Sequence, residues 1–355
     1  MKIVTIVGAR PQFIKAALVS KEIAKYPELK EIIVHTGQHF DENMSQIFFK
    51  EMEIPNPDYN LGIRSLSHGA MTGKQLEAIE KTLLDEEPDW VLVYGDTNST
   101  LAGALAAAKL HIPVIHVEAG MRSFNRKMPE EINRVLTDHI AEILFASTET
   151  AEANLMKEGI EISKIHMVGD VMYDAALHFG NIAREKSNII NDLQLERQNY
   201  ILCTVHRQEN TDDSDRLKSI VKALNQINIE RRILMPLHPR TKQIMKKQGI
   251  LLDFKSIEPV GYLDMLALLM NCNLVITDSG GLQKEAFFFQ KYCVTLRDET
   301  EWVELIEHGF NVLTGAKTNR IVETYHKMIN KSSDINIKLY GNGNSRKAIV
   351  DSFFG

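Results

Sequence analysis

The feature that most constrains the fold is an alternation of short apolar runs with longer helical patterns. In the first half, the runs KIVTIVG (residues 2–8), EIIVHTG (31–37) and WVLVYGD (90–96) are separated by segments of helical periodicity, which include a predicted helix near residues 44–52. Apolar runs without polar alternation are typical of parallel strands that are covered on both faces. The pattern therefore predicts an α/β fold built on a doubly wound parallel sheet.

The alternation begins again near VGDVMYDA (168–175), where a second set of strands and helices follows. This set includes the predicted strands NYILCTVHR (199–207), RRILMPLHPR (231–240), KSIEPV (255–260) and NLVITDSGG (273–281). A chain of 355 residues is long enough for two domains. We therefore expect two α/β domains of similar build with a cleft between them, although no low-complexity linker or internal repeat marks the boundary.

The amino-acid composition limits the classes of binding partner that are expected. The net charge of −6 and a pI near 6.1 favour neither nucleic acid nor an anionic membrane surface. The three cysteines show no paired spacing, which predicts a reducing compartment and neither a disulfide nor a zinc cluster. Neither a signal peptide nor a long apolar span is visible, so the expectation is a soluble cytoplasmic protein with no bound metal.

Polar and charged residues gather where the predicted strands end. Because ligands of open α/β sheets bind beyond the carboxyl ends of the strands, these positions are the candidate site. In the first half they are Arg10, Lys15, Gln38, His39, Asp96 and Glu118, and in the second half His206, His238, Ser279, Gly280, Gly281 and Arg297.

The stretch HVEAGMRSFNRKMPEEINR (116–134) carries the most chemistry. A strand ends in Glu118, a basic loop follows, and Glu130 and Glu131 come at a predicted helix start behind Pro129. Two carboxylates joined by a cationic loop could transfer protons beside an anionic ligand. The alternative is that the acids cap a helix and the arginines are solvated.

Other motifs also have two interpretations. Asp96 could be a turn or N-cap residue, and His206 and His238 could be structural histidines. TDSGG (277–281), a strand followed by glycines and a helix, could bind a diphosphate through free N–H groups or could form a tight turn. One turn into that helix, Glu285 could accept ribose hydroxyls. The first strand lacks the spaced glycines of a dinucleotide site, so no NAD is predicted.

Taken together, these motifs resemble the non-hydrolysing UDP-N-acetylglucosamine 2-epimerase family. The resemblance runs in order through residues 1–345 and rests on GARPQFIK, HTGQHFDENMS, YGDTNSTLAGALAA, HVEAGMRSFNRKMPEEINRVLTDH, VGDVMYDA, HPRT, TDSGGLQKEA and RDETEWVE. Within this family, the sequence is most similar to the branch that acts on UDP-2,3-diacetamido-2,3-dideoxyglucuronic acid. Enzymes that make UDP-N-acetylmannosamine are expected to differ at Ala9, Gln12, Trp302 and Val303, and the family pattern has Asp where Asn342 stands.

The resemblance implies a fold like that of the GT-B glycosyltransferases, with the active site in the interdomain cleft. The implied domains are a Rossmann-like sugar domain (1–170), a UDP-binding domain (171–340) and a helix that crosses back (341–355). The implied enzyme is an isomerase of surface polysaccharide (lipopolysaccharide O-antigen) biosynthesis, a cytoplasmic homodimer without metal or other cofactor.

The implied reaction eliminates UDP across C1–C2 to a glycal and adds it back. Asp96, Glu118, Glu130 and His206 are the implied catalytic residues, with the assignment of acid and base left open. The implied substrate-binding residues are Arg10, Lys15, Gln38, His39, Arg134, His238, Ser279, Gly280, Gly281, Glu285 and Arg297.

A uronate substrate would carry an extra anion, so Arg122, Arg126 or Lys127 is expected to pair with its C6 carboxylate. Four alternatives stay open. The substrate could be UDP-N-acetylglucosamine, or the protein could be a GT-B glycosyltransferase, a hydrolysing epimerase or a non-catalytic UDP-sugar-binding protein.

Overall fold

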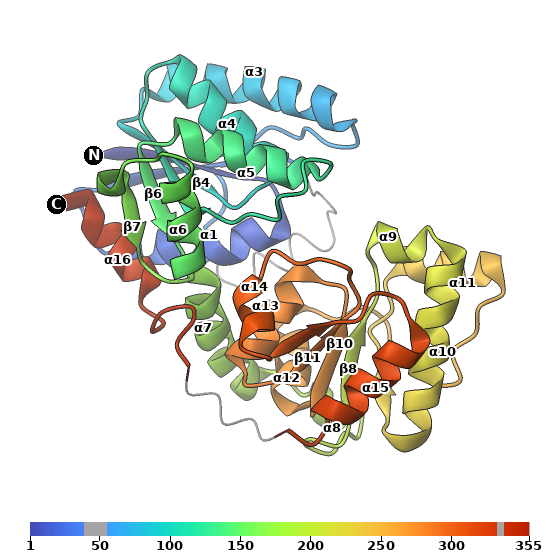
Figure 1. Ribbon diagram of the computed structural model, residues 1–355. Helices are drawn as coiled ribbons and strands as arrows, with labels where there is room; N and C mark the ends of the chain where they lie inside the picture. Colours follow the sequence, from blue (N-terminus) through green and yellow to red (C-terminus); the bar gives the residue numbers. More distant parts are fainter. Residues whose placement is uncertain (39–54, 332–336, 355) are drawn as a thin grey trace. The chain divides into compact units, whose positions relative to one another are not determined.

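A computed structural model describes residues 1–38, 55–331 and 337–354 of the chain (Figure 1). The predicted helix at 44–52 lies outside these residues. The chain divides into two compact units, of which unit 1 comprises Met1–Ala175 and Lys338–Gly355 and unit 2 comprises Ala176–Ile337. None of the described helices combines the length and the apolar character that a membrane span needs.

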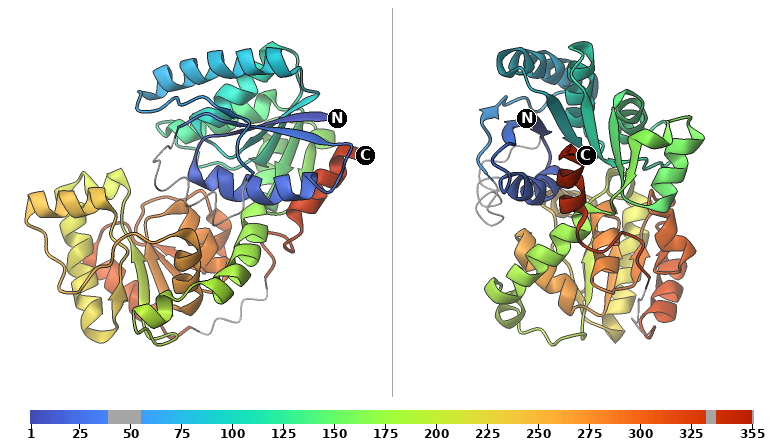
Figure 2. Two further views of the ribbon diagram at one scale, coloured as in Figure 1. Left: turned by 180° about the vertical axis from the view of Figure 1, so that it is seen from behind. Right: turned by 90° about the vertical axis from the view of Figure 1, so that its left-hand side faces the viewer.

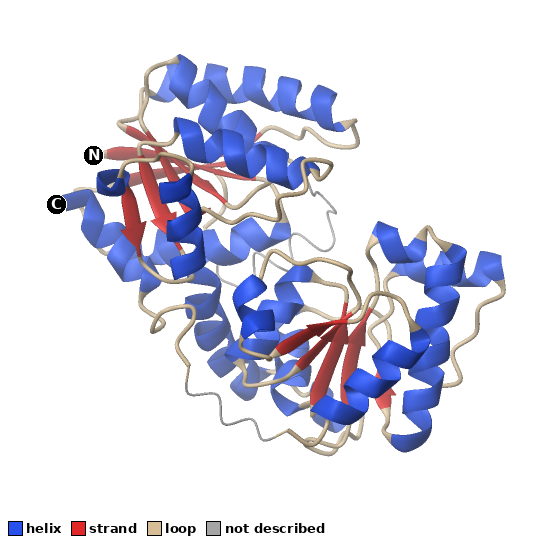
Figure 3. Ribbon diagram, viewed as in Figure 1, coloured by secondary structure: helices blue, strands red, loops and turns tan. Residues whose placement is uncertain are grey.

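Unit 1 is built on a seven-stranded sheet in the order β3-β2-β1-β4-β5-β6-β7, in which every neighbouring pair is parallel (Figure 3). Its central strands are buried almost throughout, as their continuous apolar runs predict. The strands are β1 (Lys2–Val7), β2 (Lys30–His35), β3 (Tyr59–Asn60), β4 (Trp90–Tyr94), β5 (Val114–Ala119), β6 (Ile143–Ala146) and β7 (Ile165–Met167).

Helices cover both faces of this sheet. Three of them pack side by side over one face, namely α3 (His68–Glu86), α4 (Asn98–Lys109) and α5 (Pro129–Ile140), while α1 (Arg10–Ile23) lies on the other (Figure 1). α6 (Glu149–Lys157) packs against β7. The many alanines of α4 allow close packing, and Ala102, Ala104, Ala106 and Ala107 are fully buried.

Unit 2 has a five-stranded parallel sheet in the order β12-β11-β10-β8-β9. Its strands are β8 (Ile201–Thr204), β9 (Ile233–Leu234), β10 (Leu274–Thr277), β11 (Cys293–Thr295) and β12 (Asn311–Leu313). The described helices are α8 (Ile189–Asp192), α9 (Gln208–Thr211), α10 (Ser214–Glu230), α11 (Pro239–Gln248), α12 (Tyr262–Asn271), α13 (Gly280–Phe288), α14 (Val303–Glu307) and α15 (Thr318–Met328).

Both sheets therefore confirm the expected class, a pair of Rossmann-like, GT-B-like α/β domains. Each sheet also reverses its strand order once, at β1/β4 in unit 1 and at β10/β8 in unit 2. Such a switch point opens a crevice beyond the carboxyl ends of the two strands. The predicted site residues are therefore expected to lie at these two switch points.

The C-terminal helix α16 (Ser345–Asp351) belongs to unit 1 and packs against α1 (Figure 2). The buried carboxylate of Asp174 accepts the backbone N–H groups of Ser345 and Arg346 at 3.1 and 2.9 Å, which satisfies the start of the helix. Asp174 lies in α7 (Val171–Lys186), so the division between the units, after Ala175, falls inside a helix.

The strands of unit 2 are shorter than the sequence predicts. The predicted strand at 231–240 is reduced to Ile233–Leu234, and that at 255–260 to a single bridge between Ile257 and Pro236. The reason is the proline, which lacks the N–H that would continue the ladder. The sequence did not indicate β3, β7 or β12, each of only two or three residues.

Candidate functional site

Lys15, Gly95 and Glu118 meet at the switch point of unit 1. The register places Tyr94 opposite Val117, so the residues that follow them, Gly95 and Glu118, lie side by side. A methyl group on Gly95 would lie 3.2 Å from Glu118 Oε2 and 3.4 Å from Lys15 Nζ. Lys15 and Glu118 form an ion pair, and their side chains are only 8% and 13% exposed. The elements β1–α1, β4 and β5 thus converge on a shielded carboxylate–ammonium pair.

The backbone of Glu118 is strained. Its φ is +72°, in the left-handed region that residues with a Cβ avoid, and the β5–β6 register shifts between Val117 and Ala119. Such a conformation costs about 1–3 kcal/mol and is concentrated at functional sites. The bulge turns the carboxylate toward Lys15 and away from the strand's regular alternation.

Asp96 directly follows Gly95 and is held by Arg134 of α5. The Arg134 Nε and Nη2 groups donate to Asp96 Oδ2 at 3.0 and 2.7 Å. The N-cap of α4 is Thr97, whose hydroxyl accepts the Thr100 N–H, so Asp96 is not the cap. The Asp96 side chain is 33% exposed and Arg134 only 5%, which leaves this carboxylate accessible but fixed in direction.

The two acids at the start of α5 have different environments. Glu131 is buried and accepts the N–H groups of Ser123 and Phe124, both at 2.9 Å, and also Arg134 Nη1 at 2.9 Å. Burial acts against these bonds, but the pKa of Glu131 is lowered overall. Glu130 is half-buried, and within the described part of the chain it has no hydrogen-bond or ion-pair partner. Glu131 therefore holds the loop, while Glu130 remains able to meet a ligand.

Arg122 does not fit the expectation that it pairs with a substrate carboxylate. Its guanidinium is 1% exposed and binds Glu158 at 2.8 and 2.7 Å and Asp138 at 2.7 Å. The buried Asp138 and the partly buried Glu158 occupy its donors, so the prediction for this residue is wrong. Arg126 and Lys127 are exposed and can still take the expected role. The idea that these arginines are all solvated is equally wrong for Arg122.

Gln38 follows β2 and accepts the Ser99 N–H and hydroxyl at 3.1 and 2.8 Å. It therefore ties the end of β2 to the start of α4. Arg10 begins α1 behind the end of β1. His39 lies outside the described residues.

In unit 2, Asp278 organises the switch point. It follows β10, is fully buried, and accepts the N–H groups of His206 at 3.1 Å and Arg207 at 3.0 Å, together with Asn210 Nδ2 at 3.1 Å. His206 Nδ1 is 3.5 Å from the same carboxylate. Desolvation lowers the pKa of His206 while Asp278 opposes the shift. A partly exposed, neutral imidazole at this position can accept a hydrogen bond at neutral pH.

The start of α13 is the predicted diphosphate nest. Ser279 is its N-cap and accepts the Leu282 N–H. A methyl group on Gly280 would lie 2.7 Å from Glu301 Oε1 and 3.3 Å from Arg207 Nη2, whereas Gly281 faces open space. Gly280 is therefore required for close packing, and the first N–H groups of the helix are presented beside a guanidinium, as an anion needs.

Glu285 and Arg297 are both buried in unit 2. Tyr262 donates its hydroxyl to Glu285 Oε1 at 2.8 Å, which fixes the direction of this carboxylate. Arg297 Nη1 donates to Glu301 at 2.8 Å and its Nε is 3.8 Å from Glu209. His238 is the N-cap of α11, where its Nδ1 accepts the Arg240 N–H, and its ring centroid is 6.4 Å from that of His206.

Arg207 and Asp278 stand at the ends of predicted strands, but the sequence does not predict their roles, nor does it predict the buried pair of His116 and Asp138. Asp278 orders the loop after β8, Arg207 flanks the nest, and a buried His116–Asp138 pair lies behind Asp96 and Glu118. Arg207 and Asp278 have a positional signal, because both lie at the end of a predicted strand. The role of Asp278 and the pairing of His116 with Asp138 depend on contacts between residues 72 and 22 positions apart in the chain.

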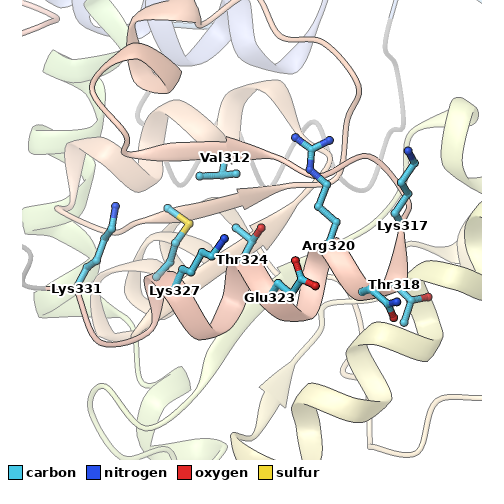
Figure 4. Close-up of a pocket in the computed structure, with 10 residues that line it drawn as sticks. Val312, Lys317, Thr318, Arg320, Glu323, Thr324, Lys327 and Lys331 are labelled. Atoms are coloured by element: carbon cyan, nitrogen blue, oxygen red, sulfur yellow. The ribbon is translucent and has the colours of Figure 1, made fainter.

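Unit 2 also has a large groove on its surface (Figure 4). It has a volume of about 1110 Å³ and runs along α15, where Val312, Lys317, Arg320, Lys327 and Lys331 are among its lining residues. None of the predicted site residues lines it. The ends of β8 and β10 carry the chemistry of unit 2, and this open groove does not.

Comparison with known proteins agrees with this geometry. The model of the family described as UDP-N-acetylglucosamine 2-epimerase matches residues 21–353. A UDP-2,3-diacetamido-2,3-dideoxy-D-glucuronate 2-epimerase of Pseudomonas aeruginosa is 54% identical over 354 residues, which are 99% of each chain.

Two solved structures are similar over 100% of both chains. The UDP-GlcNAc 2-epimerase of Methanocaldococcus jannaschii in complex with UDP-GlcNAc and UDP is 46% identical, with a TM-score of 0.93. That of Neisseria meningitidis bound to UDP-GlcNAc is 32% identical, with a TM-score of 0.90. Fold and site define a nucleotide-sugar enzyme with two Rossmann-like domains. More particularly, the chain belongs to the UDP-N-acetylglucosamine 2-epimerase family.

Proposed function

We propose that this protein epimerises C2 of a UDP-N-acetylglucosamine-type sugar without hydrolysing it. The observation that carries the proposal is the pair of acids at the ends of adjacent strands, Asp96 and Glu118, each of them bound to a cation. In this family context, a base and an acid next to each other are what removal and return of one proton require.

The C2 proton of a UDP-sugar is not adjacent to a carbonyl, so direct abstraction would leave an unstabilised carbanion. Elimination avoids this carbanion. A base takes the C2 proton, the C1–O bond breaks, and a glycal and UDP form. UDP then adds back at C1 while a proton reaches the opposite face of C2. Asp96, Glu118 and Glu130 are the proposed acid and base groups.

The leaving diphosphate needs donors and positive charge. In unit 2, the start of α13 at Gly280 and Gly281, the capping residue Ser279 and the neighbouring Arg207 support diphosphate binding. His206 and Arg297 are proposed to contact the same nucleotide, and Glu285 the ribose hydroxyls. On unit 1, Arg10, Lys15, Gln38, His39 and Arg134 are proposed to meet or to position the sugar, with His238 as a further member in unit 2.

We propose UDP-2,3-diacetamido-2,3-dideoxyglucuronate as the substrate, converted to its manno epimer for surface polysaccharide biosynthesis. The 54% identity to a relative of that name supports this choice. Arg126 and Lys127, exposed on the loop before α5, supply cations for the C6 carboxylate. Affinity for the uronate that is unchanged in Arg126→Ala and Lys127→Ala would remove this part of the proposal.

We also propose a homodimer that works in the cytoplasm, where nucleotide sugars are at hand. Exposed apolar side chains on and before α5, namely Phe124 (70% exposed), Ile132 (42%) and Leu136 (47%), support an interface in unit 1. Light scattering after gel filtration should give twice the chain mass of 40.3 kDa. In Leu136→Glu it should give the monomer mass.

Proton NMR in D2O tests the reaction itself. UDP-2,3-diacetamidoglucuronate and UDP-N-acetylglucosamine are offered separately, and deuterium should appear at C2 together with a manno-configured product. The substrate that exchanges identifies the branch. UDP binding without exchange at C2 of either sugar would contradict the proposal and favour a glycosyltransferase or a binding protein.

A further inference from the structure

Behind the two candidate acids lies a buried network that no substrate can reach. His116 in β5 and Asp138 in α5 are both fully buried, and His116 Nδ1 is 2.7 Å from Asp138 Oδ1. The other ring nitrogen, Nε2, is 2.7 Å from the carbonyl oxygen of Gly95. Asp138 Oδ2 accepts the Gly120 N–H at 3.1 Å and lies 2.7 Å from Arg122 Nη1.

Hydrogen-bond partners occupy both nitrogens of the His116 ring. The Gly95 carbonyl can only accept, so Nε2 carries a proton. Asp138 already accepts the Gly120 N–H and the Arg122 guanidinium, as an ionised carboxylate does. Burial alone would raise the pKa of Asp138, but the hydrogen bond from His116 and the charge of Arg122 bring it below its usual value. Both ring nitrogens of His116 are therefore occupied, Nε2 by the Gly95 carbonyl and Nδ1 by the Asp138 carboxyl group.

The two backbone groups in this network flank the candidate acids. Gly95 immediately precedes Asp96, and Gly120 comes two residues after Glu118. Both glycines have positive φ, +61° and +82°, so the chain turns out of the strand at each of them, and only the Gly95 N–H still pairs with the neighbouring strand, at 2.9 Å from the Val117 carbonyl oxygen. Beside this backbone bond, the His116 ring and the Asp138 carboxyl group link the Gly95 carbonyl at the end of β4 to the Gly120 N–H after β5.

We infer that His116, through Asp138, is a positioning residue that sets the separation of Asp96 and Glu118. The inference rests on the proposed epimerase function. Proton removal and return need both acids at fixed places around one carbon atom, and a misplacement of about 1 Å can cost about 100-fold in rate. A buried link that touches neither carboxylate directly can supply that fixed geometry.

Two substitutions at His116 each keep one of the ring's two hydrogen bonds and remove the other. In His116→Asn the amide nitrogen replaces Nδ1, which keeps the bond to Asp138 and removes the bond to Gly95. In His116→Gln it replaces Nε2, which keeps the Gly95 bond and removes the Asp138 bond. The control is His166→Asn, because His166 is exposed on β7 of the same unit.

Each variant is assayed for epimerisation, for UDP affinity and for thermal unfolding. We expect kcat to fall about 10- to 100-fold in both His116 variants, while KM and the Kd for UDP change by less than about threefold. The control should keep the parent kcat. A parent-like kcat in both His116 variants overturns the inference, as does a loss of kcat that equals a loss of folded protein.

Nitrogen-15 NMR of the unaltered protein gives a readout that needs no variant. A His116 ring that carries its proton on Nε2 supports the bond to Gly95, and a ring without a proton on Nε2 overturns the inference. Absence of C2 exchange in the unaltered protein is a different result, because it contradicts the proposed function and this inference with it. Exchange in the parent with normal rates in both His116 variants contradicts the inference alone.

Discussion

At the scale of single residues, the strained backbone of Glu118 and its ion pair with Lys15 single out this carboxylate. Glu118→Gln keeps the shape but loses the proton acceptor, so we expect kcat to fall by about 100- to 10,000-fold. Binding of UDP, measured by calorimetry, should remain within a few-fold. Glu142→Gln, an exposed acid of the same unit, is the control. Near-parent kcat in Glu118→Gln would remove Glu118 from the reaction.

The neighbouring acids Glu130 and Glu131 should respond in opposite ways. Glu130→Gln should lower kcat with little change in unfolding free energy. Glu131→Gln should cost about 1–3 kcal/mol of stability, because its amide would face N–H groups of Ser123 and Phe124. Urea denaturation of both variants, beside kcat, distinguishes the two roles. The reverse pattern would mean that Glu131 meets the substrate.

The lowered pKa of Glu131 also predicts that the stability of the protein depends on pH. Its pKa is lowered in the folded protein, so the unfolded chain binds protons more readily there. The stability that the parent gains from the ionised carboxylate is present above the unfolded pKa of about 4.3 and is lost as the pH falls through the lower folded value. The difference in unfolding free energy between parent and Glu131→Gln should therefore shrink below pH 4. A difference that stays constant from pH 7 to pH 3 would contradict this.

At the scale of elements, the sequence identifies the central strands and the residues beyond them, because continuous apolar runs and strand ends are local signals. It does not show the short edge strands, since two or three residues carry too little pattern. Nor does it separate Glu130 from Glu131 or reveal that Arg122 is buried, because those facts depend on Ser123, Asp138 and Glu158 folding around them. Local sequence patterns predict which positions hold candidate site residues. Tertiary contacts decide which of those side chains are bound to other protein groups and which can meet a ligand.

Glu31 lies in β2 and accepts the hydroxyl of Thr5 in β1, and its pKa predicts how the stability of this pair of strands depends on pH. Burial raises its pKa to about 6, against hydrogen bonds from Thr5 and Ser20 and with a contribution from Asp58 in the same direction. The folded state therefore favours the protonated form, and stability is lost as the pH rises through about 6. Glu31→Gln should unfold with about 1–2 kcal/mol more free energy at pH 8 and with no difference near pH 4.5.

Chemical denaturation at the two pH values measures this difference. Glu28→Gln, at an exposed position just before β2, should show no such dependence. If Glu31→Gln is equally stable as the parent at both pH values, the carboxylate is solvated and the burial argument for this pair of strands fails.

At the scale of the whole molecule, the sequence shows that two α/β sets follow each other, but it does not show where one compact unit ends. Helix α7 passes through the division at Ala175, so no change of composition marks it. The return of the last residues to unit 1 likewise depends on contacts over 171 positions, between Asp174 and Ser345. Chain order therefore predicts the contents of each unit better than its limits.

Helix α16 should accordingly control the stability of unit 1 alone. Ile349 is fully buried in unit 1, so Ile349→Ala leaves a cavity and should cost about 2–4 kcal/mol. Hydrogen exchange read by mass spectrometry should show faster exchange in α1, against which α16 packs, and unchanged exchange in α10 of unit 2. Lys347→Ala, on the exposed side of the same helix, should change neither. Equal loss of protection in α1 and α10 would mean that the two units unfold as one.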